Sequence, residues 1–102
     1  MNSMITKNSS ELNGGGIAFN GGGTLTVTNS VISYNSSGQG GGIHTQTPTI
    51  IVSNSTISGN MANGEGGGIL NYDGATITNS TISDNLVDGG IGEGGGIEND
   101  GD

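Results

Sequence analysis

The chain has 102 residues, of which 28% are hydrophobic and only 3% aromatic, so it can form one domain with an aliphatic core. A formal charge of −8, with Lys7 as the only basic side chain besides His44, argues against binding to nucleic acid or anionic membranes. Cysteine is absent, which excludes disulfides and Cys-ligated zinc, and no apolar run approaches the roughly 20 residues of a membrane span. The 23 glycines suggest disorder unless a repeat organises them.

Two short motifs alternate along the chain, and each occurs four times. The first is GGGI, whose isoleucines lie 26, 26 and 28 residues apart: Ile17, Ile43, Ile69 and Ile97. The second is NSxI(S/T)xN, whose leading asparagines lie 27, 25 and 25 residues apart: Asn2, Asn29, Asn54 and Asn79. The shared period indicates one structural unit that repeats.

Within each unit the apolar residues alternate with polar ones, as in TLTVTNS from Thr24 and TIIVSNS from Thr49. This period of two is typical of strands, and no window favours a helix. A single strand cannot bury its apolar face, whereas equivalent strands stacked from successive units form a continuous core. The sequence therefore predicts one all-β domain over residues 1–102, a parallel β-solenoid of about four coils of 25–28 residues with three strands per coil.

Alignment of the units predicts which side chains point inward. The four predicted columns are Ile17, Ile43, Ile69 and Ile97; Leu25, Ile50 and Ala75; Val27, Val52 and Ile77; and Ile5, Ile32, Ile57 and Ile82. Each fully buried aliphatic side chain contributes about 1.5–3 kcal/mol, so a dozen can hold such a domain, with Ala75 in the weakest layer. Asn29, Asn54 and Asn79 are predicted to turn a sharp corner in the left-handed conformation, with their amides stacked and hydrogen-bonded along the ladder.

The alternation of GGGI with NSxI(S/T)xN resembles the repeats of bacterial and chlamydial surface β-helix proteins. These are the polymorphic outer membrane protein type, with GGAI and FxxN signatures, and right-handed β-helix repeat proteins with a CSLREA-type segment. Ile5, Ile32, Ile57 and Ile82 stand where the FxxN signature has Phe. The resemblance implies a right-handed parallel β-helix and an extracellular or cell-surface location, although MNSMITKNSS has no signal-peptide apolar region. It also implies a structural or adhesive role, with a glycan or a host surface as the partner.

The two ends of the repeat raise a separate expectation. Four coils at a strand spacing of about 4.8 Å form a stack only about 19 Å tall, with an unpaired strand edge at each end. The chain starts and stops inside a coil, which favours either a fragment of a longer helix or a filament unit that stacks on a second copy of itself. Acidic residues near the C-terminus would oppose stacking unless a cation intervened: Glu93, Glu98, Asp100 and Asp102.

A cation site is one candidate function for the residues that precede the glycine runs. These form a column of Asn13, Gln39, Glu65 and Glu93. Carboxylates one ladder step apart can share a cation, and Ca²⁺ with oxygen ligands is the natural candidate for Glu65 and Glu93. The alternative is an exposed solubilising rim, and no other cofactor is expected.

Catalysis is not expected from this chain. A glycan hydrolase needs two paired carboxyls, and a lyase for uronates needs positive charge that Lys7 alone does not supply. His44 is the only histidine, lies in no nucleophile motif and is predicted to face solvent from a strand. A carbohydrate-binding or carbohydrate-active β-helix therefore stays an alternative to the non-enzymatic role.

The outward side of the second strand offers a further alternative. Threonines two residues apart would form ranks on one flat face: Thr24, Thr26, Thr28, Thr49, Thr76 and Thr78. Such an array resembles that of ice-binding solenoids, although threonine is also simply a good strand former. Ile51 and Gly74 interrupt the ranks. The leading prediction is a structural or adhesive surface repeat, with a filament subunit, an ice-binding solenoid and a glycan-directed β-helix as alternatives.

Overall fold

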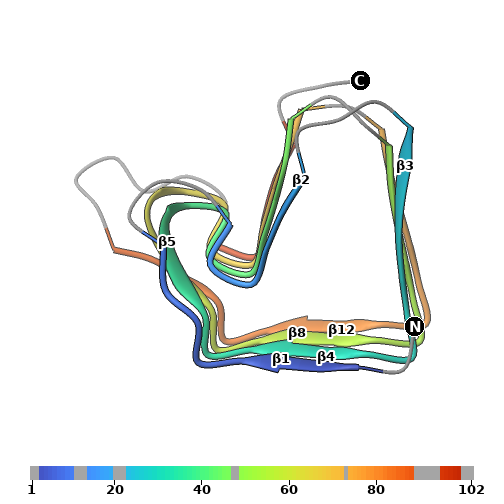
Figure 1. The fold of residues 1–102 in the computed structure, drawn as a ribbon, viewed down its shortest axis with the longest axis horizontal. Helices are drawn as coiled ribbons and strands as arrows, with labels where there is room; N and C mark the ends of the chain where they lie inside the picture. The colour runs from blue at the N-terminus through green and yellow to red at the C-terminus, as the bar shows by residue number, and fades with distance from the viewer. Residues whose placement is uncertain are drawn as a thin grey trace.

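The computed structural model describes residues 3–10, 14–19, 23–46, 49–72, 74–88 and 95–99. Their regular structure is entirely short β-strands, which wind into a solenoid (Figure 1). In chain order the strands are β1 (Met4–Thr6), β2 (Ile17–Phe19), β3 (Thr24–Thr28), β4 (Val31–Ser33), β5 (Ser36–Gln39), β6 (Ile43–Thr45), β7 (Thr49–Ser53), β8 (Thr56–Ser58), β9 (Met61–Glu65), β10 (Ile69–Asn71), β11 (Ala75–Thr78), β12 (Thr81–Ser83), β13 (Leu86–Val87) and β14 (Ile97–Asn99).

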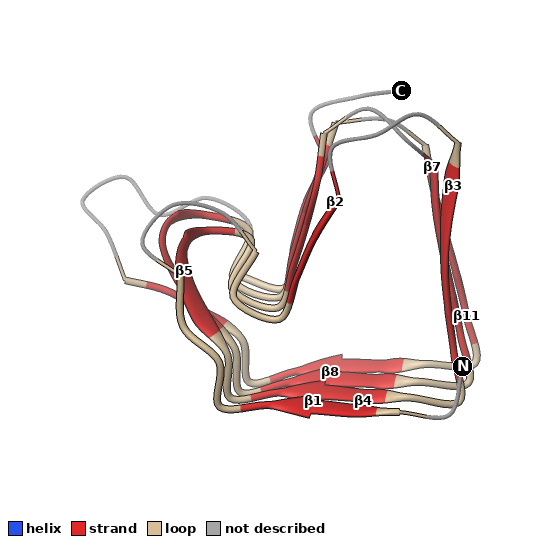
Figure 2. Ribbon diagram, in the orientation of Figure 1, coloured by secondary structure: helices blue, strands red, loops and turns tan. Residues whose placement is uncertain are grey.

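Successive coils contribute equivalent strands to four sheets, in which every pairing is parallel. Sheet 1 has the order β1-β4-β8-β12, sheet 2 has β2-β6-β10-β14, sheet 3 has β3-β7-β11 and sheet 4 has β5-β9-β13. Strands β2 to β13 thus make three complete coils, with β1 before them and β14 after them. The predicted parallel β-solenoid is confirmed, with strands stacked four deep in sheets 1 and 2 (Figure 2).

The prediction of three strands per coil is wrong, because each complete coil has a fourth strand in sheet 4. Two of these strands have the sequences SSGQ and MANGE, which lack the apolar alternation that marks the other strands. They pair through a ladder that shifts register between Ser37 and Gln39. Backbone pairing with the neighbouring coils makes these segments strands, and a single unit read alone does not reveal such pairing.

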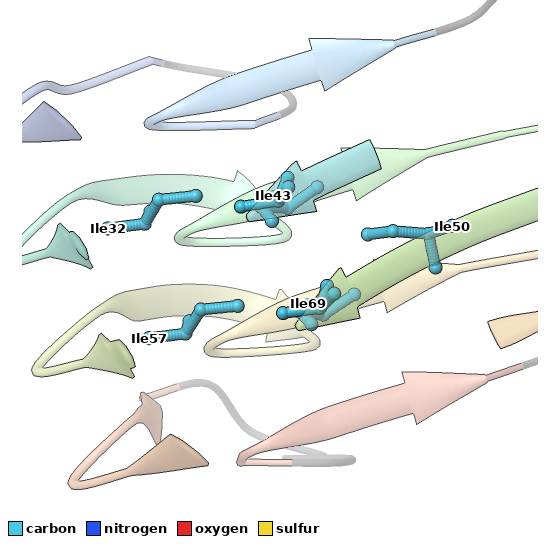
Figure 3. Close-up of a cluster of buried hydrophobic side chains, with 7 residues drawn as sticks. Ile32, Ile43, Ile50, Ile57 and Ile69 are labelled. Atoms are coloured by element: carbon cyan, nitrogen blue, oxygen red, sulfur yellow. The ribbon is translucent and has the colours of Figure 1, made fainter. Parts of the chain in front are cut away.

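The strand register agrees with the predicted inward columns. Leu25, Ile50 and Ala75 are paired across sheet 3, and Ile5, Ile32, Ile57 and Ile82 across sheet 1. The inward side chains of the middle coils are fully buried, and Figure 3 shows Ile32, Ile43, Ile50, Ile57 and Ile69 converging on one interior. The end layers are more open, with Ile97 37% exposed and Ala75 exposed. Apart from Val27 on β3, which is completely buried, the column residues on the end strands are partly exposed.

The corner asparagines follow their prediction in backbone conformation and depart from it in their side chains. Asn29, Asn54 and Asn79 have φ values of 49°, 50° and 47°, which is the left-handed conformation expected of them. Their side chains are exposed, however, so the predicted amide stack is not at this corner. A residue with left-handed φ directs its side chain away from the coil interior here, which leaves the buried amide role to the asparagine that ends the motif.

That terminal asparagine forms a ladder of four residues, buried at its centre: Asn8, Asn35, Asn60 and Asn85. At each step the backbone N–H and the Nδ2 group of one asparagine both donate to Oδ1 of the next, over 2.9–3.1 Å. The second Nδ2 proton is donated to a backbone carbonyl of the preceding coil, as in the bond from Asn60 Nδ2 to Ile32 O at 3.0 Å. Asn35 and Asn60 are completely buried, and their polar side-chain atoms are satisfied by coil-to-coil bonds.

Each of the three positions of the GGG run requires glycine for a different structural reason. The first, at Gly14, Gly40 and Gly66, has φ of 61–63°, which glycine adopts at no steric cost. In the runs at residues 14–16, 40–42 and 66–68, the second glycine lies against the backbone of sheet 4. The third glycine lies against the amide of the ladder asparagine, so an added Cβ collides in both places. The glycine run is therefore what allows the chain to fold back beside the asparagine ladder.

We expect Gly41→Ala to destabilise the protein by about 2–3 kcal/mol, because the new Cβ would overlap the Gly67 and Met61 carbonyl oxygens. Gly64→Ala is the matched control, since its Cβ would lie 3.3 Å from Gly38 O and nothing else closer than 3.8 Å. Urea unfolding followed by circular dichroism measures both. Equal stability of the two variants would contradict the close backbone packing at Gly41.

Candidate functional surfaces

The threonine ranks lie in register on the outer face of sheet 3. Thr26 is paired with Ile51 and then Thr76, and Thr28 with Ser53 and then Thr78. Thr24 is paired with Thr49, but β11 begins only at Ala75, so this rank has two threonines. Thr24, Thr26, Thr76 and Thr78 are exposed, whereas Thr28 and Thr49 are half-buried. The array is therefore present but interrupted at its centre by Ile51, and ice binding stays a prediction.

The predicted cation column can be followed only in part. Gln39 and Glu65 are direct partners across β5 and β9 in sheet 4. Asn13 and Glu93 lie outside the described residues. Among the residues that the structure does describe, no three His, Cys, Asp or Glu side chains gather closely enough to hold a metal ion. Calcium binding by Glu65 and Glu93 stays a prediction.

His44 is buried, and the prediction that it faces solvent is wrong. It lies on β6 with a relative exposure of 2%, in one column with Ala18, Leu70 and Glu98. The chain folds back between sheet 4 and sheet 2 (Figure 1). A Cβ placed on Gly40, in this fold-back, would collide with the His44 Cβ atom, so Gly40 covers this side of His44. The Tyr72 ring packs edge to face against the imidazole, with 6.0 Å between the ring centroids. His44 Nδ1 has no hydrogen-bond partner among the described residues.

The buried imidazole should make stability depend on pH. Burial lowers the pKa of His44 below its usual value of 6.5, and this effect outweighs the opposing influence of the residue's own backbone. The unfolded chain then binds the proton more readily than the folded one, so stability is complete above pH 6.5 and falls as the pH drops below it. Glu98, two strands along the same column, and Tyr72 are the ionisable groups on this side of sheet 2 that the structure places near the imidazole.

We expect wild-type stability to fall between pH 6.5 and 5.5 with a slope of at most about 1.4 kcal/mol per pH unit, the limit for one proton. His44→Leu should remove this slope and the unpartnered nitrogen together. Urea unfolding at half-unit pH intervals checks the expectation. Parallel pH profiles for the two proteins would contradict a lowered pKa of the imidazole.

The structure also reveals a groove that the motifs did not predict. A concavity of about 310 Å³ crosses three coils beside sheet 4, lined by Ser9, Ser10, Ser36, Ser37, Met61 and Asn63. Ser9 bridges to Ser36, which pairs with Met61, so the lining is held in register by the ladder. Its polar groups are hydroxyls and one amide, which suit a neutral ligand rich in hydroxyl groups. The repeated NSS at residues 8–10 and 35–37 was the available sequence signal.

A second corner separates sheet 1 from sheet 4, and its column carries unlike side chains. Lys7, Tyr34, Gly59 and Asp84 occupy equivalent positions with φ of 60°, 58°, 67° and 55°. The Tyr34 ring lies over Gly59, where it contacts the position that a Cβ would fill. The only lysine is thus at one end of this column and an aspartate at the other.

Four parallel sheets, a repeat of 25–28 residues and an aliphatic core define the protein as a parallel β-solenoid. A protein-family model described as a right-handed beta helix region matches residues 1–102, and the chain belongs to this family. Comparisons with curated proteins and with solved structures gave no significant match. No helix in the described parts of the chain is long and apolar enough to cross a membrane.

Proposed function

We propose that this β-helix is a non-enzymatic structural or adhesive repeat element of an exported cell-surface protein. The bacterial polymorphic outer membrane protein type or the CSLREA type is the subgroup that its motifs resemble. The observation that carries the proposal is the use of buried polar groups to join coils. The Asn8, Asn35, Asn60 and Asn85 ladder bonds each coil to the next, and the buried amides of Asn35 and Asn60 are fully used in these bonds.

A ladder of serines near the start of the NSxI(S/T)xN motif also supports a structural role. Backbone N–H groups of Ser3, Ser30 and Ser55 donate to the hydroxyl of the serine one coil above, over 3.1–3.3 Å. The Ser55 and Ser80 hydroxyls in turn donate to the carbonyls of Ser53 and Thr78. Bonds that run coil to coil at two corners resist bending and sliding, which suits a rigid spacer that holds a binding surface away from a cell.

Surface display tests this proposal directly. The chain is placed between an epitope tag and an outer-membrane anchor on bacteria, and tag accessibility and adhesion to host cells or matrix are measured. We expect the folded chain to increase tag reach or adhesion, and an Ile50→Asp variant, which should not fold, to abolish the gain. A folded displayed chain that changes neither quantity would contradict the proposal.

The groove beside sheet 4 favours carbohydrate binding as a second candidate function. Its lining of four serines, Asn63 and Met61 has no ionisable side chain, and the chain charge of −8 disfavours anionic glycans. We expect a neutral oligosaccharide to bind here, with affinity reduced at least about fivefold by Ser36→Ala with Asn63→Ala. Thr26→Ala with Thr76→Ala on sheet 3 is the matched control. Oligosaccharide titration by NMR or calorimetry distinguishes the two pairs.

A further inference from the structure

The described solenoid has two end faces with complementary hydrogen-bonding groups. The lower face is formed by β1, Ser9 and β2, and the upper face by β12, β13 and β14. At every described step of the asparagine ladder, the lower residue donates and the upper Oδ1 accepts. The upper face therefore ends in the donors of Asn85, and the lower face in the Oδ1 acceptor of Asn8. A coil of the same kind placed above Asn85 would continue the ladder.

The backbone carbonyl at the same corner also points toward the next coil. Ser36 N–H donates to Asn8 O, Met61 N–H to Asn35 O and Leu86 N–H to Asn60 O. The next bond in this series would join Asn85 O to the N–H of a residue in the position of Ser9. The serine ladder is continued in the same way, because its bonds run from the N–H of one coil to the hydroxyl of the coil above, as from Ser55 to Ser80.

The charged residues at the two end faces favour a second copy of this chain as the next coil. Asp84 is the upper member of the left-handed column between sheets 1 and 4, and Lys7 is the lower member. A second chain that continues the ladder would place its Lys7 one strand spacing, about 4.8 Å, above Asp84. The only lysine of the protein would then form an ion pair with a carboxylate of the neighbouring copy.

We propose that a second copy of this chain stacks head to tail on the first, with β1 on β12 and Lys7 beside Asp84. This contact goes beyond the proposed surface role, because it rests on the two end faces alone. It is heterologous, so repeated addition makes an open filament and not a closed dimer. The half-buried end residues Ile5 and Ile82 become inner members of a continuous column.

The fit involves three of the four sheets. Stacking β1 on β12 also brings Ser9 onto β13 and β2 onto β14, since these follow one another in the same coil. Sheet 3 ends at β11 and resumes at β3 of the next copy, which leaves one strand position between them. The remaining negative charge of each copy opposes the contact, and salt at physiological strength screens it beyond about 8 Å.

Charge reversal at the two ends tests the contact. Wild-type protein is compared with Lys7→Glu, with Asp84→Lys and with an equimolar mixture of these two variants, by sedimentation and negative-stain microscopy over a range of concentrations. We expect wild type to form fibres whose width matches the 32 by 25 Å cross-section. Each variant alone places like charges together and should need about tenfold more protein to assemble, equivalent to about 1.4 kcal/mol.

The mixture provides the decisive comparison, because alternating copies bring opposite charges together again at every interface. The two introduced side chains face each other at one interface, and the native Lys7 and Asp84 face each other at the next. We expect the mixture to assemble as wild type does. Glu65→Lys, which changes the net charge as Asp84→Lys does but lies inside the stack, should assemble normally.

Three results would each overturn the proposal: a wild type that stays monomeric, single variants that assemble unchanged, or a mixture that fails to recover. Circular dichroism verifies that every variant is folded, so that a loss of assembly is not mistaken for a loss of structure.

Discussion

Ile50→Asp is expected to unfold the protein, whereas Ile51→Asp is expected to leave it folded. The two isoleucines are adjacent on β7, but Ile50 is completely buried and Ile51 is 36% exposed. An aspartate at position 50 would place an unpaired charge among aliphatic side chains, at a cost of at least about 5 kcal/mol. That is comparable with the whole stability of a domain of this size. At position 51 the carboxylate reaches water, and we expect a loss below about 1 kcal/mol.

Urea unfolding followed by circular dichroism measures both variants under the same conditions. The pair is a direct test of strand register, because a slip by one residue would exchange the two side chains between the interior and the surface. Ile51→Asp unfolding the chain while Ile50→Asp is tolerated would therefore refute the pairing of Ile50 with Leu25 and Ala75.

Asn60→Ala is expected to cost about 3–4 kcal/mol, far more than the same change at Asn54. Asn60 Oδ1 accepts from the backbone and side chain of Asn35, and Asn60 Nδ2 donates to Ile32 O. Alanine would leave these buried groups without partners, at about 1–3 kcal/mol for each unsatisfied group, with partial relaxation reducing the sum. Asn54 is exposed and its role is conformational, so its replacement by alanine should cost about 1 kcal/mol.

Thermal and urea denaturation measure the loss of stability in the two alanine variants. Both replace an asparagine of the same coil, so the comparison isolates the position of the side chain. The coil-to-coil ladder predicts an additional effect in Asn60→Ala only, a lower protection of the Asn35 amide proton from hydrogen exchange, because that proton is donated to Asn60 Oδ1. Similar losses of stability at the two positions would contradict the assignment of the ladder to the second asparagine of the motif.

Most of the fold can be predicted because it is a local pattern repeated four times. The period of 25–28 residues specifies which residues stack, and the alternation in segments such as TLTVT specifies which of them face inward. The left-handed corner at Asn29, Asn54 and Asn79 follows from residue type alone. These features need only one unit and the rule that equivalent units stack.

The errors share one cause, which is contact between segments that the pattern treats separately. Alternation with Ile43 on a short strand predicts a surface position for His44, but the fold-back at the glycine run covers that face and buries it. Sheet 4 escapes prediction because SSGQ and MANGE become strands through pairing and carry no apolar alternation of their own. The serine groove depends on three coils and is invisible in one.

Period and alternation are sufficient to specify the parallel solenoid, its register and its isoleucine columns. Only the folded chain shows which asparagine carries the buried amide ladder, since Asn54 and Asn60 belong to one motif and differ in the direction of their side chains. Only the folded chain, too, shows that the motif position shared by Lys7 and Asp84 turns a second left-handed corner, between sheets 1 and 4. Residue type is sufficient for the left-handed corner at Asn54, but the direction of the Asn60 side chain and the second corner depend on how neighbouring coils stack, which residue type does not specify.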